Sequence, residues 1–252
     1  MTNALKQKWR AGEPGLGAWL AIPNSWVAEA VSRLGFDYVC VDLQHGMIDY
    51  PDATELILAI HAAGGTPIVR VPSNDLAAIN RVLDAGALGI IVPLIESVAD
   101  VEAAVAACRY PPAGRRSYGP NRAALVAGPD YFETANENVL CIPMVETRAA
   151  LDAVEDLAAV PGVDALYVGP NDLSLSLGLP PGADNPDPYQ TAYRRIAKAC
   201  QEAGIVAGIH ANADLCAKHL DAGYRMVTVS TDASALTRGA AADLKKARAV
   251  SR

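Results

Sequence analysis

Short apolar runs alternate with amphipathic segments rich in Ala and Leu along almost the whole chain. Eight of these runs predict strands buried on both faces: Gly15–Ile22, Tyr38–Leu43, Pro67–Val71, Gly89–Ile95, Val139–Glu146, Ala165–Gly169, Val206–His210 and Met226–Ser230. The segments between them predict helices, among them Asp52–Ala63, Asp75–Ala85, Val98–Cys108, Arg148–Ala159, Tyr189–Ala203, Asn212–Asp221 and Ala233–Ala249. Such alternation is typical of a parallel sheet. Eight repeats favour an α/β fold closed into a (β/α)8 TIM barrel over an open doubly wound sheet.

One segment interrupts this alternation. Residues 109–138 include YPPAGRRSYGPNR and show no clear periodicity, so we expect a long shaped loop. Because this segment follows a helix, it should lie on the face opposite the strand ends. It could reach a site there only by wrapping back or through a neighbouring subunit, and a solvated surface loop is the alternative. Gly178–Pro188 predicts a second, proline-rich connector.

The length and composition agree with a single domain, 1–252. Hydrophobic residues make up 51% of the chain and charged residues 19%, which indicates a large core and little disorder. The net charge of −7 and the pI of about 5.1 argue against a nucleic-acid partner.

Nothing in the sequence predicts a membrane protein or a secreted one. No apolar run approaches the ~20 residues that span a bilayer, and residues 1–15 lack the apolar core of a signal peptide. The five cysteines are scattered and form no C-x-x-C motif, so they are expected to be small buried side chains in a reducing compartment. We therefore expect a cytoplasmic protein.

Two of the apolar runs lead directly to a carboxylate. Glu146 closes VLCIPMVE, and Asp172 follows ALYV and the turn GPN. If the two strands are neighbours, their ends lie about 4.8 Å apart. Two like charges that close need a proton or a cation between them. Mg²⁺ and Mn²⁺ are commonly held by one or two carboxylates, so we predict a metal site at Glu146 and Asp172.

A purely structural explanation of the same residues is the alternative. Asp172 would then cap the N-terminus of a helix that begins near Leu173, and Glu146 would pair with Arg148. The turn before this helix also presents backbone N–H groups that favour an anion such as a carboxylate.

Two further strand ends carry polar side chains. Arg70 ends the strand in PIVR, where its planar fork suits a substrate carboxylate; an internal ion pair with Asp42 or Asp84 is the alternative. His45 lies three residues after Asp42, whose carboxylate would fix the tautomer of the ring and leave its other nitrogen as a base. A local hydrogen bond without catalysis would explain this pair equally well.

The remaining ionisable residues offer fewer indications. His210 ends the run VAGIH and is interpreted either as a core residue or as a supporting one, whereas His61 and His219 lie within helices and receive no role. The six lysines all lie in terminal or helical stretches, which argues against a buried Schiff-base lysine.

Six phrases occur in order along the chain: FDYVCVDLQHG, PIVRV, DAGALGIIVP, RYPPAGRRSYGP, PMVET and PGVDALYVGPNDLSLSLG. Together they resemble the HpcH/HpaI family of metal-dependent pyruvate aldolases, over nearly the whole chain. Known members include 4-hydroxy-2-oxoheptanedioate and 2-keto-3-deoxy-sugar-acid aldolases. The resemblance implies a TIM barrel assembled as a hexamer, or trimer of dimers, with a terminal helix (here 233–249) exchanged between subunits.

The resemblance also implies a role for individual residues. The metal carboxylates fall on Glu146 and Asp172, and the arginine that clamps pyruvate falls on Arg70. The base falls on His45, supported by Asp42, and Asp84 matches an aspartate that joins this network across a subunit boundary. The substrate is expected to contact Arg70, Gln44, Gly169, Pro170, Asn171 and Asp172.

Two positions depart from the family pattern. Many relatives have Gly-Glu-His where this chain has Leu43-Gln44-His45, and many have Gln where this chain has Met144. The first change removes a negative charge beside the base, and the second removes a polar contact to substrate. We expect the chemistry to survive both changes and the substrate preference to differ.

The expected reaction cleaves a 4-hydroxy-2-oxo acid to pyruvate, or a related 2-oxo acid, and an aldehyde. A divalent metal, Mg²⁺ or Mn²⁺ with Co²⁺ as a further candidate, would stabilise the enolate. One alternative is a CoA-ester lyase of the citrate-lyase β-chain type, with the basic loop 115–122 near the nucleotide. The other is a non-catalytic barrel that serves as a binding or assembly module.

Overall fold

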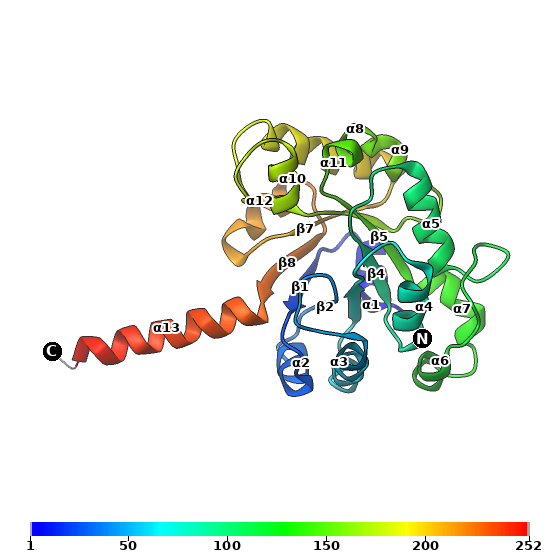
Figure 1. Ribbon diagram of the computed structural model, residues 1–252, viewed down its shortest axis with the longest axis horizontal. Helices are drawn as coiled ribbons and strands as arrows, with labels where there is room; N and C mark the ends of the chain where they lie inside the picture. The colour runs from blue at the N-terminus through cyan, green and yellow to red at the C-terminus, as the bar shows by residue number, and fades with distance from the viewer. Residues whose placement is uncertain (1, 251–252) are drawn as a thin grey trace.

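The computed structural model describes residues 2–250 and shows a closed barrel of eight parallel strands (Figure 1). Each strand pairs with the next one along the chain, and β8 pairs with β1. The strands are β1 Gly15–Leu20, β2 Tyr38–Asp42, β3 Pro67–Arg70, β4 Gly89–Val92, β5 Leu140–Val145, β6 Ala165–Val168, β7 Val206–His210 and β8 Met226–Thr231. The predicted TIM barrel is confirmed. Residues 1, 251 and 252 of the predicted domain lie outside the described part.

Helices surround the barrel (Figure 1). They are α1 Ala4–Arg10, α2 Ser25–Ser32, α3 Tyr50–Ala62, α4 Leu76–Asp84, α5 Val98–Cys108, α6 Asn121–Ala127, α7 Tyr131–Asn138, α8 Arg148–Asp152, α9 Val154–Ala158, α10 Pro170–Ser176, α11 Tyr189–Ala203, the 3₁₀ turn η1 Ala213–Leu215, α12 Cys216–Asp221 and α13 Asp232–Val250. Two predicted helices are divided: Arg148–Ala159 breaks at Ala153, and Asn212–Asp221 begins with η1.

The expectation of a long shaped loop without helices over residues 109–138 is wrong for its second half, which contains α6 and α7. Both helices are short, so their periodicity is weak in the sequence. Tertiary contacts hold them. The buried Arg116 side chain lies against the ring of Tyr131 on α7, and the two share a hydrogen bond of 2.9 Å. A contact between residues 15 apart in the sequence is not visible in the local pattern of apolar and polar residues.

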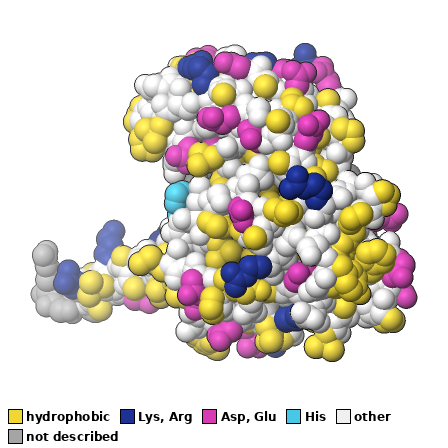
Figure 2. All heavy atoms as spheres, turned by 45° about the vertical axis from the view of Figure 1, so that its right-hand side comes forward, with side chains coloured by type: hydrophobic (Ala, Val, Ile, Leu, Met, Phe, Trp, Pro, Cys, Tyr) yellow, Lys and Arg dark blue, Asp and Glu magenta, His cyan; other side chains and the backbone are white. Residues whose placement is uncertain are grey.

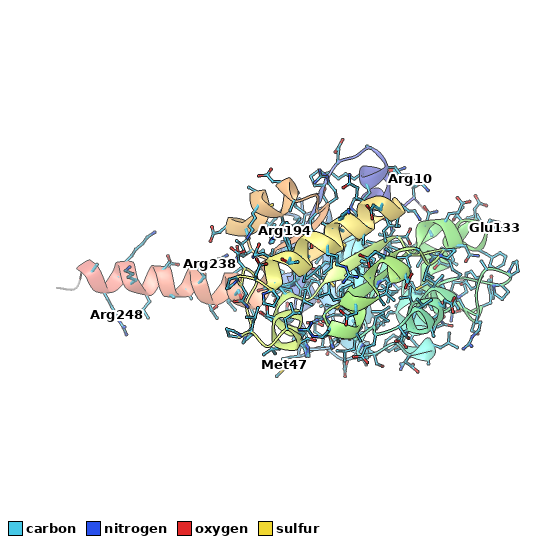
Figure 3. The ribbon with its side chains drawn as sticks, turned by 90° about the horizontal axis from the view of Figure 1, so that it is seen from above. Arg10, Met47, Glu133, Arg194, Arg238 and Arg248 are labelled. Carbon is cyan, nitrogen blue, oxygen red and sulfur yellow. The ribbon has the colours of Figure 1, made fainter. Side chains whose placement is uncertain are left out.

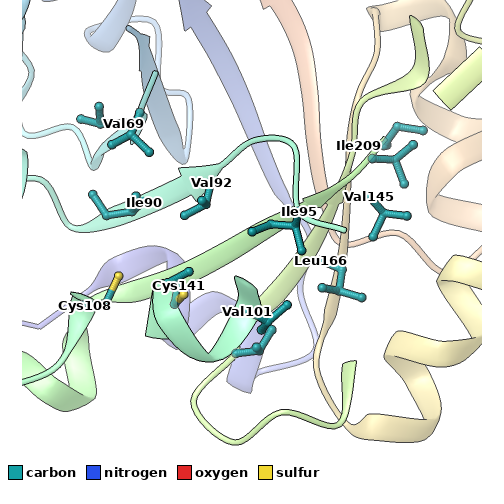
Figure 4. Close-up of a cluster of buried hydrophobic side chains, with 14 of the residues drawn as sticks. Val69, Ile90, Val92, Ile95, Val101, Cys108, Cys141, Val145, Leu166 and Ile209 are labelled. Carbon is teal, nitrogen blue, oxygen red and sulfur yellow. The ribbon is translucent and has the colours of Figure 1, made fainter. Parts of the chain in front are cut away.

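Strand side chains alternate between two cores, as expected for a pleated strand. One set faces the surrounding helices; Figure 4 shows part of it, with Val69 of β3 and Val145 of β5. The other set fills the barrel interior and includes Tyr38, Ile142 and Tyr167. Leu5 of α1 is packed with this interior set, so α1 closes the barrel at the end where the strands begin.

The last helix, α13, runs away from the barrel, with Arg238 and Arg248 along it (Figures 1 and 3). Asp232, its first residue, accepts hydrogen bonds from the backbone N–H groups of Ala21 and Ile22, which fixes the end of β8 to the end of β1. Its leucines Leu236 and Leu244 are exposed. Exchange of this helix between subunits stays a prediction.

The surface is mixed in charge on the face seen in Figure 2, where acidic and basic side chains are interspersed. No helix within residues 2–250 has both the length and the apolar character needed to cross a bilayer.

Gly17 makes the interior packing testable. A Cβ at this position would overlap the ring of Tyr38, which is fully buried in the barrel. Gly17→Ala should therefore lower the free energy of unfolding by about 1–3 kcal/mol, the usual cost of overpacking. Urea unfolding measures the change. Gly239→Ala is the matched control, because Gly239 lies in α13 with no atom near its Cβ position. Equal stability of Gly17→Ala and the parent would contradict the described packing.

Candidate active site

Interior side chains change from apolar to charged at the ends of three strands. On β2 the interior positions run through Tyr38 and Cys40 to Asp42, and on β3 they run from Ile68 to Arg70. On β5 the same alternation continues past the last strand residue to Glu146. All three charged groups therefore lie at one rim of the barrel, the rim at which TIM-barrel enzymes carry their active sites.

Asp42 and Arg70 form a buried ion pair. They are direct partners across β2 and β3, and Arg70 donates from Nε to Oδ1 at 2.8 Å and from Nη2 to Oδ2 at 2.6 Å. The indole N–H of Trp19 donates to the same carboxylate at 3.0 Å. Burial alone would raise the pKa of Asp42, but the bonds and charge of Arg70 outweigh it, so the pKa is lowered. The internal ion pair considered from the sequence is present.

Arg70 also faces the cavity at this rim. Within residues 2–250 its Nη1 donates to no protein group, so one edge of the guanidinium stays available. Arg70 therefore forms an internal ion pair with Asp42 and still presents a donor edge to the cavity. The internal ion pair and the binding of a substrate carboxylate, which the sequence left as alternatives, are compatible.

Glu146 and Asp172 line the same cavity. Val145 of β5 and Val168 of β6 are register partners, so the two carboxylates come from adjacent strand ends. Glu146 is 2% exposed and accepts a hydrogen bond from the N–H of Leu94 at 2.7 Å. Burial raises the pKa of Glu146, and the nearby charge of Asp172 raises it further.

The structural alternative for these two residues is not what the structure shows. The helix α10 begins at Pro170, its N-cap is Gly169, and no side chain caps it, so Asp172 lies within the first turn. Among the described residues Glu146 makes no ion pair with Arg148. Within residues 2–250 the carboxylate of Asp172 also has no hydrogen-bond partner.

Two carboxylates with unused oxygens fit a divalent cation. Glu146 uses only Oε1 in hydrogen bonding, and a Cβ on Gly169 would overlap Oε2, so the glycine leaves room for this oxygen. Oxygen ligands suit Mg²⁺ and Mn²⁺. No group of three or more His, Cys, Asp or Glu side chains suited to a metal is found over residues 2–250. Other ligands of a cation here would be water or substrate.

His45 lies on the loop after β2, is exposed, and lines the cavity. Its contact with Asp42 differs from the prediction: the backbone N–H of His45 donates to Oδ1 at 3.3 Å, and no bond joins its ring to that carboxylate. Asp42 is occupied by Arg70 and Trp19 instead. The ring of His45 is thus free to act at the cavity but is not oriented by Asp42.

The cavity has a volume of about 120 Å³. Its wall is completed by Trp19, Met144, Tyr167 and His210. The rings of Trp19 and Tyr167 stack at 5.8 Å, and His210 meets Trp19 edge to face at 4.9 Å between centroids. These apolar surfaces enclose a small polar centre, an arrangement typical of small-molecule sites.

Comparison with known proteins agrees with this geometry. The model of the HpcH/HpaI aldolase/citrate lyase family matches residues 16–238. The chain belongs to the HpcH/HpaI aldolase/citrate lyase family. It is accordingly a carbon–carbon lyase, and the resemblance deduced from the six phrases is confirmed.

Relatives in the HpcH/HpaI family cover the whole barrel. A hydroxypyruvate/pyruvate aldolase from Rhizorhabdus wittichii is 35% identical over 98% of this chain and 100% of its own. A 4-hydroxy-2-oxo-heptane-1,7-dioate aldolase from Klebsiella pneumoniae is 35% identical over 96% of this chain and 92% of its own. The crystal structure of a family member from Burkholderia cenocepacia superimposes with a TM-score of 0.92, at 39% identity, over 98% of this chain and 100% of that one.

Two of the residues assigned from the HpcH/HpaI resemblance lie away from the cavity in this chain. Asp84 ends α4, whose C-terminus is at the opposite face of the barrel, and pairs with Arg116 at 2.9 Å. Gln44 is not part of the cavity wall; its Oε1 is buried without a hydrogen-bond partner among the described residues. A role for Asp84 in a neighbouring subunit stays a prediction.

Sequence reasoning missed Trp19, Tyr167 and Leu94. Trp19 and Tyr167 carry a signal that could have been used, because both occupy interior positions of predicted strands near the same rim. Leu94 carries no such signal, since its contribution to the site is a backbone N–H.

The partly buried His210 makes stability depend on pH. Burial, and then the charge of Arg70, lower the pKa of His210 to about 4, against about 6.5 in an unfolded chain. Between these values the unfolded state binds more protons than the folded state, so the free energy of unfolding falls as pH drops from about 6.5 to about 4. The full contribution of His210 is about 3 kcal/mol at most.

Urea unfolding at pH 7.5 and pH 5 should therefore show a smaller acid loss for His210→Gln than for the parent. An equal loss in both proteins would show that His210 is protonated as easily in the fold as in the unfolded chain.

Proposed function

We propose that this protein is a divalent-metal-dependent aldolase that cleaves 4-hydroxy-2-oxo acids to pyruvate, or a related 2-oxo acid, and an aldehyde, and that catalyses the reverse addition. The observation that carries the proposal is that two carboxylates without an ion-pair partner among residues 2–250, Glu146 and Asp172, line one small cavity together with the guanidinium edge that Arg70 leaves unused. The names of the two aldolase relatives support the same reaction class.

Glu146 and Asp172 would hold the cation, with Mg²⁺ or Mn²⁺ preferred and Co²⁺ as a further candidate. When bound, the cation supplies Lewis-acid polarisation of the 2-oxo group and of the enolate that develops from it. Burial and the charge of Asp172 raise the pKa of Glu146, and a cation held by both residues would lower the electrostatic cost of keeping the two carboxylates ionised.

Arg70 would bind the carboxylate of the 2-oxo acid through Nη1, the atom that Asp42 leaves unused. Asp42 holds the guanidinium plane in place through two bonds, so Asp42 acts on substrate through Arg70. Backbone N–H groups of Asn171 and Asp172, in the Gly169–Asp172 turn that lines the cavity, would complete the binding of the substrate.

His45 would act as the base. In the cleavage direction its ring takes the proton of the substrate 4-hydroxyl, the bond between C3 and C4 breaks, and C4 leaves as the aldehyde carbonyl. The electron pair of that bond forms the enolate of the 2-oxo acid, which is then protonated to give pyruvate. His45 is exposed and lines the cavity, so its ring can reach a substrate hydroxyl there.

The proposal extends to a homo-oligomer, a hexamer or a trimer of dimers, in a cytoplasmic setting. The projection of α13 and its exposed leucines support exchange of this helix between subunits. Asp84 would then approach the site of a neighbouring copy. Light scattering of the full chain, and of a variant ending at residue 231, measures the predicted change of mass.

The test of the function uses chelated protein, pyruvate in deuterium oxide and proton NMR. Addition of Mg²⁺ or Mn²⁺ should start exchange of the pyruvate methyl protons, and cleavage of a panel of 4-hydroxy-2-oxo acids should return with it. A CoA thioester is assayed in parallel to detect the alternative lyase. Absence of exchange with every metal would contradict the proposal.

Arg70 and His45 should affect different kinetic constants. His45→Ala should lower kcat by about 10²–10⁴-fold, the usual contribution of general-base catalysis. Arg70→Ala should mainly raise KM for the 2-oxo acid, and it should also destabilise the fold because Asp42 is left buried without its partner. Steady-state kinetics with Lys198→Ala, an exposed substitution on α11, provides the control. Parent-like constants for both variants would contradict these roles.

A further inference from the structure

Leu94, at the rim of the barrel, is unusual in two respects: its backbone is left-handed and its large apolar side chain is exposed. Leu94 has a φ of +53°, and it is the sole non-glycine residue with a left-handed backbone in the part of the chain that the structure describes. A side chain with a Cβ is strained there, because Cβ crowds the following carbonyl. The leucine is also 58% exposed, so burial of its side chain does not offset the strain. Strained residues of this kind gather at functional sites.

The strain has a visible consequence at Glu146. Strand β4 ends at Val92, which is the register partner of Pro143 on β5. Two residues later the chain turns at Leu94, and the N–H of Leu94 points at Oε1 of Glu146 at 2.7 Å. This is the one hydrogen bond that Glu146 receives from residues 2–250. Its length lies at the short end of the usual range for N–H···O bonds.

The other oxygen of Glu146 lies on the side of β6. A Cβ on Gly169 would overlap Oε2, so the glycine leaves this oxygen the space it occupies. Leu94 thus fixes one oxygen while the other stays available at the cavity.

We propose that Leu94 is a positioning residue for the cation site. Its left-handed peptide holds Oε1 of Glu146 so that Oε2 is presented to the cation. The inference rests on the proposed metal-dependent function and makes a separate statement: the backbone conformation and the N–H of residue 94 are required, and the leucine side chain is not.

Substitutions at position 94 separate backbone from side chain. Glycine and asparagine accept a left-handed backbone, whereas a β-branched residue does not. Leu94→Val should therefore misdirect the N–H and weaken Mn²⁺ binding by about 10-fold or more, the usual value of a hydrogen bond to a charged group. Leu94→Gly and Leu94→Asn should bind Mn²⁺ within about twofold of the parent, as the N–H keeps its place.

The readout is the Kd of Mn²⁺, measured from the electron paramagnetic resonance signal of the free ion with full-length protein. Leu58→Val is the matched control, because Leu58 is 54% exposed on α3 and lies outside the cavity wall. This control should leave the Kd of Mn²⁺ unchanged.

An ester at the same position tests the N–H alone and does not depend on the folding of the valine variant. Replacing Leu94 by its α-hydroxy acid through nonsense suppression deletes the donor and keeps the side chain. The Kd of Mn²⁺ should again rise by about 10-fold or more.

Undiminished Mn²⁺ binding by the ester protein, or a loss in Leu94→Gly as large as that in Leu94→Val, would overturn the role of Leu94 and leave the aldolase proposal intact. A parent protein that binds none of Mn²⁺, Mg²⁺ and Co²⁺ would overturn both.

Discussion

The closed barrel imposes one constraint from which the site follows. Along each strand successive side chains alternate between the interior and the helices, so the residue that ends an interior series reaches the rim. On β2, β3 and β5 this residue is Asp42, Arg70 or Glu146. On β6 it is Gly169, whose missing side chain leaves space for Glu146. The alternation that packs the core therefore also brings Asp42, Arg70 and Glu146 together, and the first turn of α10 adds Asp172.

The charges of Arg70 and Asp42 at this rim balance each other, whereas those of Glu146 and Asp172 do not. Arg70 and Asp42 neutralise each other through two short bonds, and the lowered pKa of Asp42 keeps the pair ionised at neutral pH. Within residues 2–250 Glu146 forms no ion pair, and burial and the charge of Asp172 raise its pKa. A fold that holds two carboxylates in this way is destabilised by their repulsion. A bound cation removes the repulsion and adds its binding free energy to the stability of the folded state.

The sequence was sufficient to predict the eight strands because each is a buried apolar run whose period is independent of distant contacts. It could not predict α6 and α7. Both are short helices that depend on tertiary contacts, such as the hydrogen bond between Arg116 and Tyr131 of α7. It placed Glu146 and Asp172 beyond the ends of two adjacent strands correctly, since neighbours in a closed barrel follow from strand order, although Asp172 lies in the first turn of α10. It could not decide whether Asp42 supports His45 or Arg70, because that depends on the direction of a loop side chain. The strained backbone of Leu94 leaves no trace in residue type.

Met144 shares one wall of the cavity with the groups that the proposed chemistry uses. Arg70 ends β3, Glu146 directly follows β5 and Asp172 lies in the first turn of α10, so the packing of the barrel fixes all three positions. Met144 lies one interior step below Glu146 and contributes a thioether to the cavity wall, beside the rings of Trp19 and Tyr167. A polar group of a substrate placed against these side chains would lose its water without gaining a strong partner. A substrate group that contacts the wall beside Met144 is therefore expected to be apolar, while the ionic part of the cavity is built from Arg70, Glu146 and Asp172.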